Sequence, residues 1–276
     1  MSVFNNGSIT LPEGNVLSFG EFGKGIPLLL LHGNPGNRED WAGVAKLLGG
    51  RGFRCLAVDR PGHGKSSVLP VEAGRAADAY ATLLRSGAGG KAVVIGYSMG
   101  THFALDLAER YPDLVSGVGL VAPYLMPRDE SEKPSGLPGL LNIPVLGSML
   151  GLAMPVLAGG KIRRHLEATF RPATASPALL DDLIGTFSTV ASLTAMMRDK
   201  NLFLATCKQV VSGAVSLRCP LLIVTGTKDE IAGKAGEETV KTAIPGAHAV
   251  EIADGGHALL WTHATFVADR ISEEFA

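Results

Sequence analysis

The stretch "GYSMG" at residues 96–100 places a serine between two glycines, where an apolar run ends and a helical pattern begins. A sharp strand-to-helix turn strains the backbone of its central residue, and side chains two positions to either side of that residue would collide. Glycine at both flanking positions removes the collision, and the turn lifts the Ser98 hydroxyl above the sheet. The pattern predicts a nucleophilic serine. The alternative is that small residues merely permit the turn.

A hydroxyl is a poor nucleophile until a base accepts its proton, and His257 is the candidate base. It follows the last apolar strand in "ADGGHALLW", where two glycines let the loop bend back over the sheet. Asp229, just beyond "LLIVTG", is the candidate acid that would hold the imidazole in one tautomer and stabilise its charged form. Two rival acids exist: we expect Glu230 to point away and Asp254 to cap the bend before His257.

Six other histidines could in principle serve as the base. We expect His32 to be structural in its strand-end loop, His63 to lie in a turn, and His102 to pack on the helix that follows the serine. The remaining three are expected to face solvent: His165, His248 and His263.

The chemistry also needs donors for the oxyanion of a tetrahedral intermediate. The backbone N–H of Met99, at the start of the helix after the serine, is one candidate. The second should come from the loop "HGNPG" (32–36), where the Asn34 N–H is the natural choice. An ordinary tight turn is the alternative reading of that loop. We also name Tyr97 and Tyr124 as substrate-binding residues.

Apolar runs and stretches of helical spacing alternate along most of the chain, which requires a mostly parallel sheet with helices on both faces. The predicted strands are 8–11, 15–22, 26–33, 53–59, 91–96, 114–123, 219–226 and 248–254, and the predicted helices are 38–52, 71–87, 99–110, 176–191, 233–243 and about 259–275. No convincing strand occurs between residue 124 and about 205. We therefore predict a helical cap over 124–205, inserted into a core made of 1–123 and 206–276.

In an open parallel sheet, ligands bind outside the carboxyl ends of the strands. Five of the predicted ends carry polar or glycine-rich loops, which would bring the serine, the acid and the histidine to one edge. One of these loops is "DRPGHGKS" (59–66), in which we expect Asp59 to organise a turn with Arg60 and Ser66.

Composition excludes several classes of protein. With 46% hydrophobic and 18% charged residues, the chain is expected to bury a large core rather than to be disordered. Its formal net charge of −1 gives no electrostatic case for nucleic acid. The three cysteines are far apart and lack any CxxC spacing, which favours reduced thiols in a cytoplasmic protein over disulfides or a zinc site.

Two segments bear on targeting and membranes. The first fifteen residues lack a basic region followed by an apolar stretch, so we expect no signal peptide. Residues 134–160 contain no charge and precede "KIRRH", which imitates a membrane span. Four prolines and six glycines interrupt that stretch. This density favours a lid of short, broken helices rather than a membrane-spanning helix.

Five motifs, in their order and separations, resemble those of the α/β-hydrolase superfamily: "LLLLHGNPG", "DRPGHGKS", "GYSMG", "TGTKDE" and "DGGH". The resemblance runs from about residue 26 to 257. It implies an eight-stranded sheet with a helical cap inserted after the sixth strand. It also implies Ser98 as nucleophile, Asp229 as acid and His257 as base, with the Asn34 and Met99 amides binding the oxyanion. Epoxide hydrolases and haloalkane dehalogenases of this superfamily would place aspartate at position 98.

We therefore predict a serine hydrolase that cleaves an ester or related acyl bond of a small, largely apolar substrate, with no metal or organic cofactor. The stretch "LPGLLNIPVLGSMLGLAMPVL" (137–157) suits an apolar acyl group or ring, although the same residues could simply pack the cap onto the core. Two other hypotheses remain. The same triad could break a carbon–carbon bond in a ketone, or the fold could serve a binding or receptor protein with little turnover.

Overall fold

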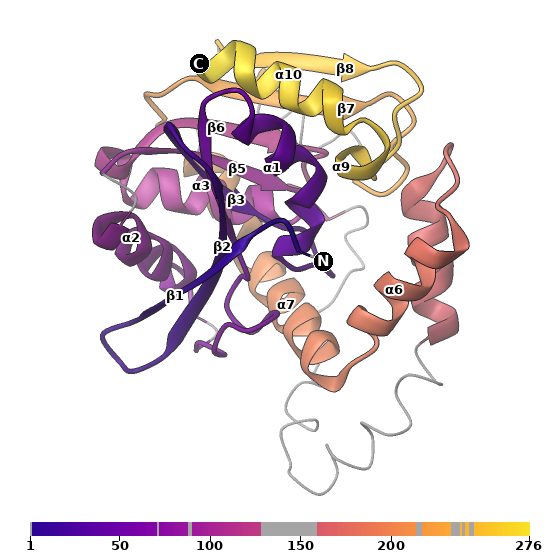
Figure 1. Ribbon diagram of the computed structural model, residues 1–276, viewed down its shortest axis with the longest axis horizontal. Helices are drawn as coiled ribbons and strands as arrows, with labels where there is room; N and C mark the ends of the chain where they lie inside the picture. Colours follow the sequence, from indigo (N-terminus) through magenta and orange to yellow (C-terminus); the bar gives the residue numbers. More distant parts are fainter. Residues whose placement is uncertain are drawn as a thin grey trace, which may run out of the picture.

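The computed structural model describes residues 2–70, 72–87, 90–127, 159–213, 217–232, 238, 241–242 and 246–276. At its centre lies an eight-stranded sheet in the order β1-β2-β4-β3-β5-β6-β7-β8 (Figure 1). The strands are β1 Asn5–Thr10, β2 Val16–Gly23, β3 Ile26–Leu31, β4 Phe53–Val58, β5 Ala92–Tyr97, β6 Val115–Val121, β7 Leu221–Gly226 and β8 His248–Ile252. The β1–β2 and β2–β4 pairings are antiparallel and every pairing from β4 to β8 is parallel, so the predicted sheet is confirmed.

Helices cover both faces of the sheet. They are η1 Arg38–Trp41, α1 Ala42–Gly49, α2 Arg75–Gly87, α3 Gly100–Arg110, η2 Pro112–Leu114, α6 Pro177–Phe187, α7 Val190–Gly213, α9 Leu259–Thr262 and α10 Ala264–Phe275, and residues 159–170 are helical as well. One apolar cluster joins α1 and α10 to the sheet, and another joins α2, α3 and α7 to the opposite face. The predicted helix at 233–243 falls mostly outside the described residues.

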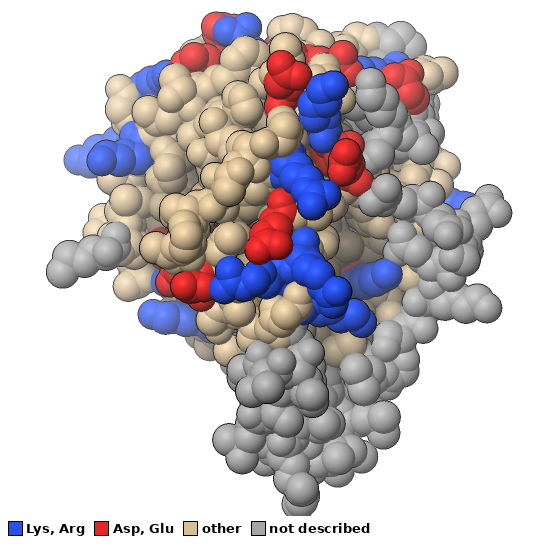
Figure 2. All heavy atoms as spheres, turned by 90° about the vertical axis from the view of Figure 1, so that its right-hand side faces the viewer, with Lys and Arg blue, Asp and Glu red and all other residues tan. Residues whose placement is uncertain are grey.

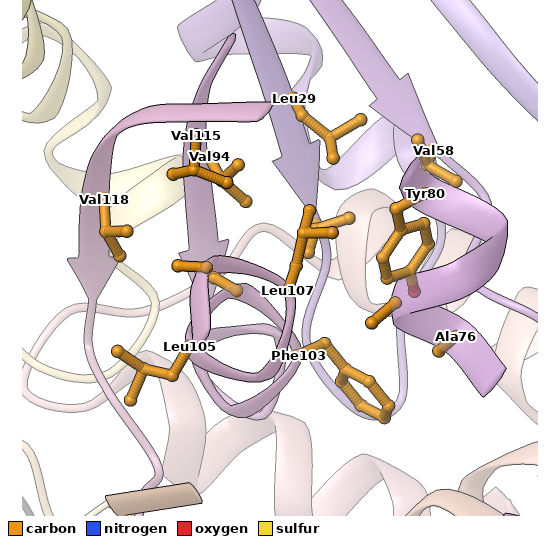
Figure 3. Packing of buried hydrophobic residues seen from close by; sticks show 14 of the residues in the cluster. Leu29, Val58, Ala76, Tyr80, Val94, Phe103, Leu105, Leu107, Val115 and Val118 are labelled. Atoms are coloured by element: carbon orange, nitrogen blue, oxygen red, sulfur yellow. The ribbon is translucent and has the colours of Figure 1, made fainter. Parts of the chain in front are cut away.

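Strand β3 shows why a continuous apolar run is needed at the centre of such a sheet. Its four leucines are fully buried and alternate between the two clusters. Leu28 and Leu30 belong to the cluster with α1 and α10, whereas Leu29 and Leu31 belong to the cluster with α2 and α3. Figure 3 shows Leu29 in that second layer, above Phe103 of α3. A strand covered on both faces needs apolar side chains at every position rather than at alternate ones.

Within the described part of the predicted cap, α6 lies beyond the carboxyl ends of β7 and β8 (Figure 1), whereas α7 packs against α3. Helix α6 begins as expected, with the Ser176 side chain accepting the Leu179 N–H at 3.3 Å and proline in its first turn. Helix α7 runs without a break across residue 205, the predicted end of the cap. The cap limits, 124–205, stay a prediction, and the apolar stretch 137–157 lies outside the described residues.

The face that carries α6 has positive and negative side chains intermixed (Figure 2). One ion pair in this part of the chain joins Arg163 to Asp181 at 2.5 Å and so ties the helical residues 159–170 to α6. In the ranges given above, no helix is both long enough and apolar enough to cross a membrane.

The turn between β5 and α3 fixes Ser98 in a left-handed conformation, with φ of 52°. Its two flanking glycines leave no room for side chains. A Cβ on Gly96 would lie 2.5 Å from the carbonyl carbon of Gly100, and a Cβ on Gly100 would lie 2.3 Å from the Leu31 oxygen. The Ser98 N–H donates to the Val121 oxygen at 2.9 Å, which anchors the turn to β6. The predicted strand-turn-helix geometry is therefore present.

Replacing Gly100 with alanine should destabilise the protein by about 1–3 kcal/mol, because the new methyl group meets backbone rather than a flexible side chain. Gly185→Ala in α6 is the matched control, since nothing lies within 4 Å of its Cβ position. That change should stabilise by about 0.5–1 kcal/mol, as alanine is the better helix former. Urea unfolding of both variants measures the difference, and shifts of the same sign would contradict the packing argument.

Candidate active site

Ser98, His257 and Asp229 form one continuous chain of hydrogen bonds at the carboxyl edge of the sheet. The His257 Nε2 atom lies 2.8 Å from Ser98 Oγ, and its Nδ1 atom lies 2.7 Å from Asp229 Oδ2. An ionised carboxylate only accepts hydrogen bonds, so Nδ1 carries the proton and Nε2 is left to accept the Ser98 hydroxyl. The serine and the histidine are both buried. The structure thus brings together the three side chains that the sequence singled out.

Asp229 stays ionised because several donors surround its carboxylate. Burial raises the pKa of this group, but the hydrogen bond and electrostatic attraction of His257, with the backbone N–H groups of Ala232 and Ile231, outweigh that effect. The net result is a pKa below the ordinary value for aspartate. The two amides donate to Oδ1 at 2.9 and 2.8 Å, which leaves Oδ2 for the imidazole. Both charge and orientation therefore favour one tautomer of His257.

The loop that carries His257 is held from both sides. On one side, the His257 carbonyl accepts a hydrogen bond from the Tyr97 hydroxyl at 3.1 Å. On the other side, the Ala258 N–H donates to the Thr169 oxygen at 3.1 Å, so the helical residues 159–170 contact the loop directly. A Cβ on Gly256 would lie 1.7 Å from the Arg171 oxygen. The predicted need for glycines before His257 thus has a steric cause.

The two amides expected to bind an oxyanion are unengaged. Neither the Asn34 N–H nor the Met99 N–H donates a hydrogen bond to any residue that the structure describes. The loop "HGNPG" passes against the serine, because a Cβ on Gly33 would lie 3.1 Å from Ser98 Cβ. The Asn34 side chain is fixed separately, with Nδ2 donating to the Met196 oxygen at 2.9 Å.

The two tyrosines named as substrate contacts take different positions. Tyr97 is buried in the cluster that faces α1 and α10, and its ring packs on His257 and Trp261 with centroids 5.5 and 5.8 Å apart. Its hydroxyl donates to the histidine loop, and its role as a substrate contact stays a prediction. Tyr124 is half-buried and its ring packs on Phe203 of α7, with centroids 5.0 Å apart.

A buried ion pair close to the site was missed by the sequence reasoning. Arg60 Nη1 lies 2.5 Å from Asp199 Oδ2, and His63 Nε2 lies 2.9 Å from the same oxygen. These residues come from a loop of the core and from α7, and no local pattern connects positions 139 apart in the chain. The Asp59 carbonyl does accept the Ser66 hydroxyl at 2.6 Å, as expected for the turn, while the side chain of Arg60 is directed to Asp199 instead.

The rival bases and acids have other environments. His102 is buried, and desolvation lowers its pKa to about 4, while its Nε2 lies 3.0 Å from the Thr206 hydroxyl. His248 is exposed and lies 2.7 Å from Glu274. Glu230 and Asp254, the alternative acids, are both exposed. In the described ranges, no group of three or more His, Cys, Asp or Glu side chains is placed to bind a metal ion.

A cavity of about 280 Å³ lies between α7 and the loop that follows β4. Its described walls contain Arg60 and Asp199, but not Ser98, Asp229 or His257. Most of the other wall residues are apolar, among them Val68, Leu69, Phe103, Val190, Ala195 and Leu202. It is therefore separate from the serine and adjoins the buried ion pair.

The chain is similar in sequence to two kinds of curated hydrolase. Lipase 3 of Moraxella sp. is 27% identical over 271 residues, which cover 91% of this chain and 78% of that protein. Bifunctional epoxide hydrolase 2 of Mus musculus is 29% identical over 171 residues, which cover 60% of this chain and 30% of that protein. The chain thus spans less than a third of the length of curated relatives of this kind.

Among solved structures, a thermophilic esterase from Thermogutta terrifontis superposes with a TM-score of 0.74 at 25% identity, covering 98% of this chain and 97% of that one. A family model described as the alpha/beta hydrolase fold matches residues 26–264, the span from β3 to the start of α10. With the sheet order and the strand-end loops of that fold in place, the chain belongs to the alpha/beta hydrolase fold family.

Proposed function

We propose that the protein is a serine hydrolase that cleaves an ester or related acyl bond of a small, largely apolar substrate. The observation that carries the proposal is the chain of hydrogen bonds from Asp229 through His257 to Ser98, with contacts of 2.7 and 2.8 Å. Two unengaged amides beside the serine, those of Asn34 and Met99, add the donors that an acyl-transfer site requires.

The proposed reaction follows from these positions. His257 Nε2 accepts the hydroxyl proton as Ser98 Oγ attacks the carbonyl carbon, and the negative oxygen is stabilised by the Asn34 and Met99 amides. The protonated imidazole then gives its proton to the departing alcohol, leaving an acyl-enzyme. Water attacks the acyl carbon with His257 as base, the Ser98 oxygen leaves with a proton, and the free acid is released.

A serine at position 98 favours acyl substrates over epoxides. Attack of a hydroxyl on an epoxide carbon forms an ether, which water does not hydrolyse at neutral pH. Attack on an acyl carbon forms an ester, which the same site can hydrolyse. The names of the Moraxella lipase and the Thermogutta esterase agree with this choice, although the Mus musculus relative is an epoxide hydrolase.

The surroundings of His257 support an apolar substrate. The neighbouring residue, Ala258, belongs to an apolar cluster with the helical residues 159–170 and α6, and Met196 and Met197 of α7 pack against that cluster. We propose that 124–205 acts as a cap whose apolar side encloses the acyl group. We also propose a cytoplasmic location, because the three cysteines are unpaired and two of them are buried.

Ser98→Ala should lower kcat for a short-chain p-nitrophenyl ester by about 10⁴- to 10⁶-fold, because the nucleophile is lost. It should also abolish labelling by a fluorophosphonate. Ser18→Ala is the control: this serine is buried in β2 and accepts a hydrogen bond from Arg38 at 3.0 Å. Equal ester hydrolysis by wild type and Ser98→Ala would rule out the acyl-enzyme. Labelling without turnover of any ester would instead favour a carbon–carbon hydrolase or a binding protein.

Asp229→Asn should lower kcat by about 10³- to 10⁴-fold with little change in KM, because an amide no longer fixes the productive tautomer of His257. The controls are the two rival acids: Glu230→Gln and Asp254→Asn should retain nearly full activity. Steady-state kinetics at neutral pH compares the three variants, and a larger loss in either control would reassign the acid.

The pKa of Asp229 in the folded protein lies below the ordinary value for aspartate. The ionised carboxylate therefore contributes to stability at pH values above the ordinary pKa, and this contribution is lost as the pH falls through the lowered pKa.

A further inference from the structure

The peptide between Gly33 and Asn34 carries the proposed oxyanion donor on one side and a carbonyl on the other. A trans peptide is planar, so the Asn34 N–H points away from the Gly33 C=O. Whatever holds the Gly33 carbonyl therefore also sets the direction of the Asn34 N–H. This makes the partners of a carbonyl outside the triad relevant to catalysis.

Two buried donors hold the Gly33 carbonyl. Arg60 Nη2 donates to it at 2.7 Å, and His32 Nδ1 lies 2.9 Å from it. The tautomer of His32 is fixed, because its Nε2 accepts the Arg60 backbone N–H at 3.0 Å and Nδ1 must therefore carry the proton. Burial and the positive charges of Arg60 and His63 hold the pKa of His32 well below its ordinary value, so the ring stays neutral.

The guanidinium of Arg60 is in turn held by α7. Its Nη1 atom pairs with Asp199 Oδ2 at 2.5 Å, and its Cζ atom lies 4.6 Å from the centre of the Phe103 ring. The Arg60 side chain is almost fully buried, so its direction is set by these contacts rather than by solvent. Asp199 and Met196 are three residues apart and share one face of α7. The Met196 oxygen accepts a hydrogen bond from the Asn34 side chain. Helix α7 therefore contacts the "HGNPG" loop directly through Met196 and indirectly through Asp199 and Arg60.

We propose that Arg60 is a positioning residue: Asp199 of α7 holds its guanidinium against the Gly33 carbonyl and thereby aims the Asn34 N–H at the oxyanion. The inference rests on the proposed function, in which an oxyanion forms when Ser98 attacks the acyl carbon. Helix α7 begins within the predicted cap. The contacts of this helix with the core therefore also support the orientation of the oxyanion donor, and loss of Asp199 removes one of these supports.

A purely structural ion pair is the competing explanation, and a double variant separates the two. Replacing a buried ion pair by neutral residues of similar size is often harmless to folding, whereas removing one partner strands a buried charge. Arg60→Met with Asp199→Asn removes both charges and leaves an acceptor for His63 Nε2. If the ion pair is only structural, the folded double variant should have normal catalysis. If Arg60 is a positioning residue, the double variant should fold but have impaired catalysis.

We expect the double variant to keep its melting temperature within a few degrees of wild type while kcat for a p-nitrophenyl ester falls about 10- to 100-fold. Loss of a complete oxyanion donor costs about 10²- to 10³-fold, and a misaimed donor costs less. KM should change less than about twofold. The inhibition constant of an aryl trifluoromethyl ketone should rise by the same factor as kcat falls, because its adduct places an oxyanion in the same site. Arg60→Lys should recover part of the loss, since lysine donates but lacks the fork geometry.

Arg38→Met is the matched control, because Arg38 is also buried and also lies near a carboxylate, with 3.7 Å to Asp59, but donates to β2 rather than to the loop. It should lower stability and leave the ratio of inhibition constant to KM unchanged. If the double variant shows wild-type kcat and inhibitor affinity, the inference is overturned.

A crystal structure of the double variant reports on the peptide without any assay. The inference expects the Gly33–Asn34 peptide to be rotated or disordered, and an unchanged orientation overturns it even if the protein hydrolyses no ester. Conversely, a wild-type protein that resists both esters and fluorophosphonate overturns the proposed function. The two failures are therefore distinguishable. Should the double variant not fold, Arg60→Lys alone carries the same inhibitor and structural measurements.

Discussion

The close approach of the β5–α3 turn to the end of β3 is the constraint on which the site depends. A Cβ on Gly100 would lie 2.3 Å from the carbonyl oxygen of Leu31 and 2.6 Å from that of His32, so a side chain has no room there. This contact brings the start of α3 beside the loop that follows β3, so the Met99 and Asn34 amides come from the two sides of one junction. The histidine and the acid come from loops after β8 and β7, which lie further along the same edge beyond β6.

The fold was predictable because its elements have strong local signals. Four consecutive leucines in β3 indicate burial on both faces, and the structure divides them between the two apolar clusters. The ends of elements were less predictable. The predicted helix at about 259–275 is two helices that meet at His263, because the first, α9, begins directly after the loop that carries His257 and ends after one turn. Helix α7 passes the predicted cap boundary at 205 for the same kind of reason: packing against α3 and β-sheet core, rather than composition, determines its length.

In the site, the reacting side chains were predictable and the contacts that orient the surrounding loops were not. The side chains of Ser98, Asp229 and His257 follow from strand-end positions and from flanking glycines, which are visible in the sequence. What holds them was not visible. The Tyr97 hydroxyl reaches the His257 carbonyl across 160 positions, and Arg60 reaches Asp199 across 139. Such contacts depend on three-dimensional packing, and buried charges of this kind leave no periodic pattern. A sequence therefore indicates which groups react more readily than which groups orient them.

The same division explains how one scaffold can host different hydrolases. The close contacts that shape the junction act on backbone atoms and on the glycines at 33, 96 and 100, and none of them involves the side chain at 98 beyond its Cβ. That side chain instead decides which covalent intermediate forms. Serine on an acyl carbon gives an ester that water can cleave, whereas serine on an epoxide gives an ether that it cannot. Under the proposed mechanism, position 98 thus determines the class of bond, while the backbone junction determines where the charge is stabilised.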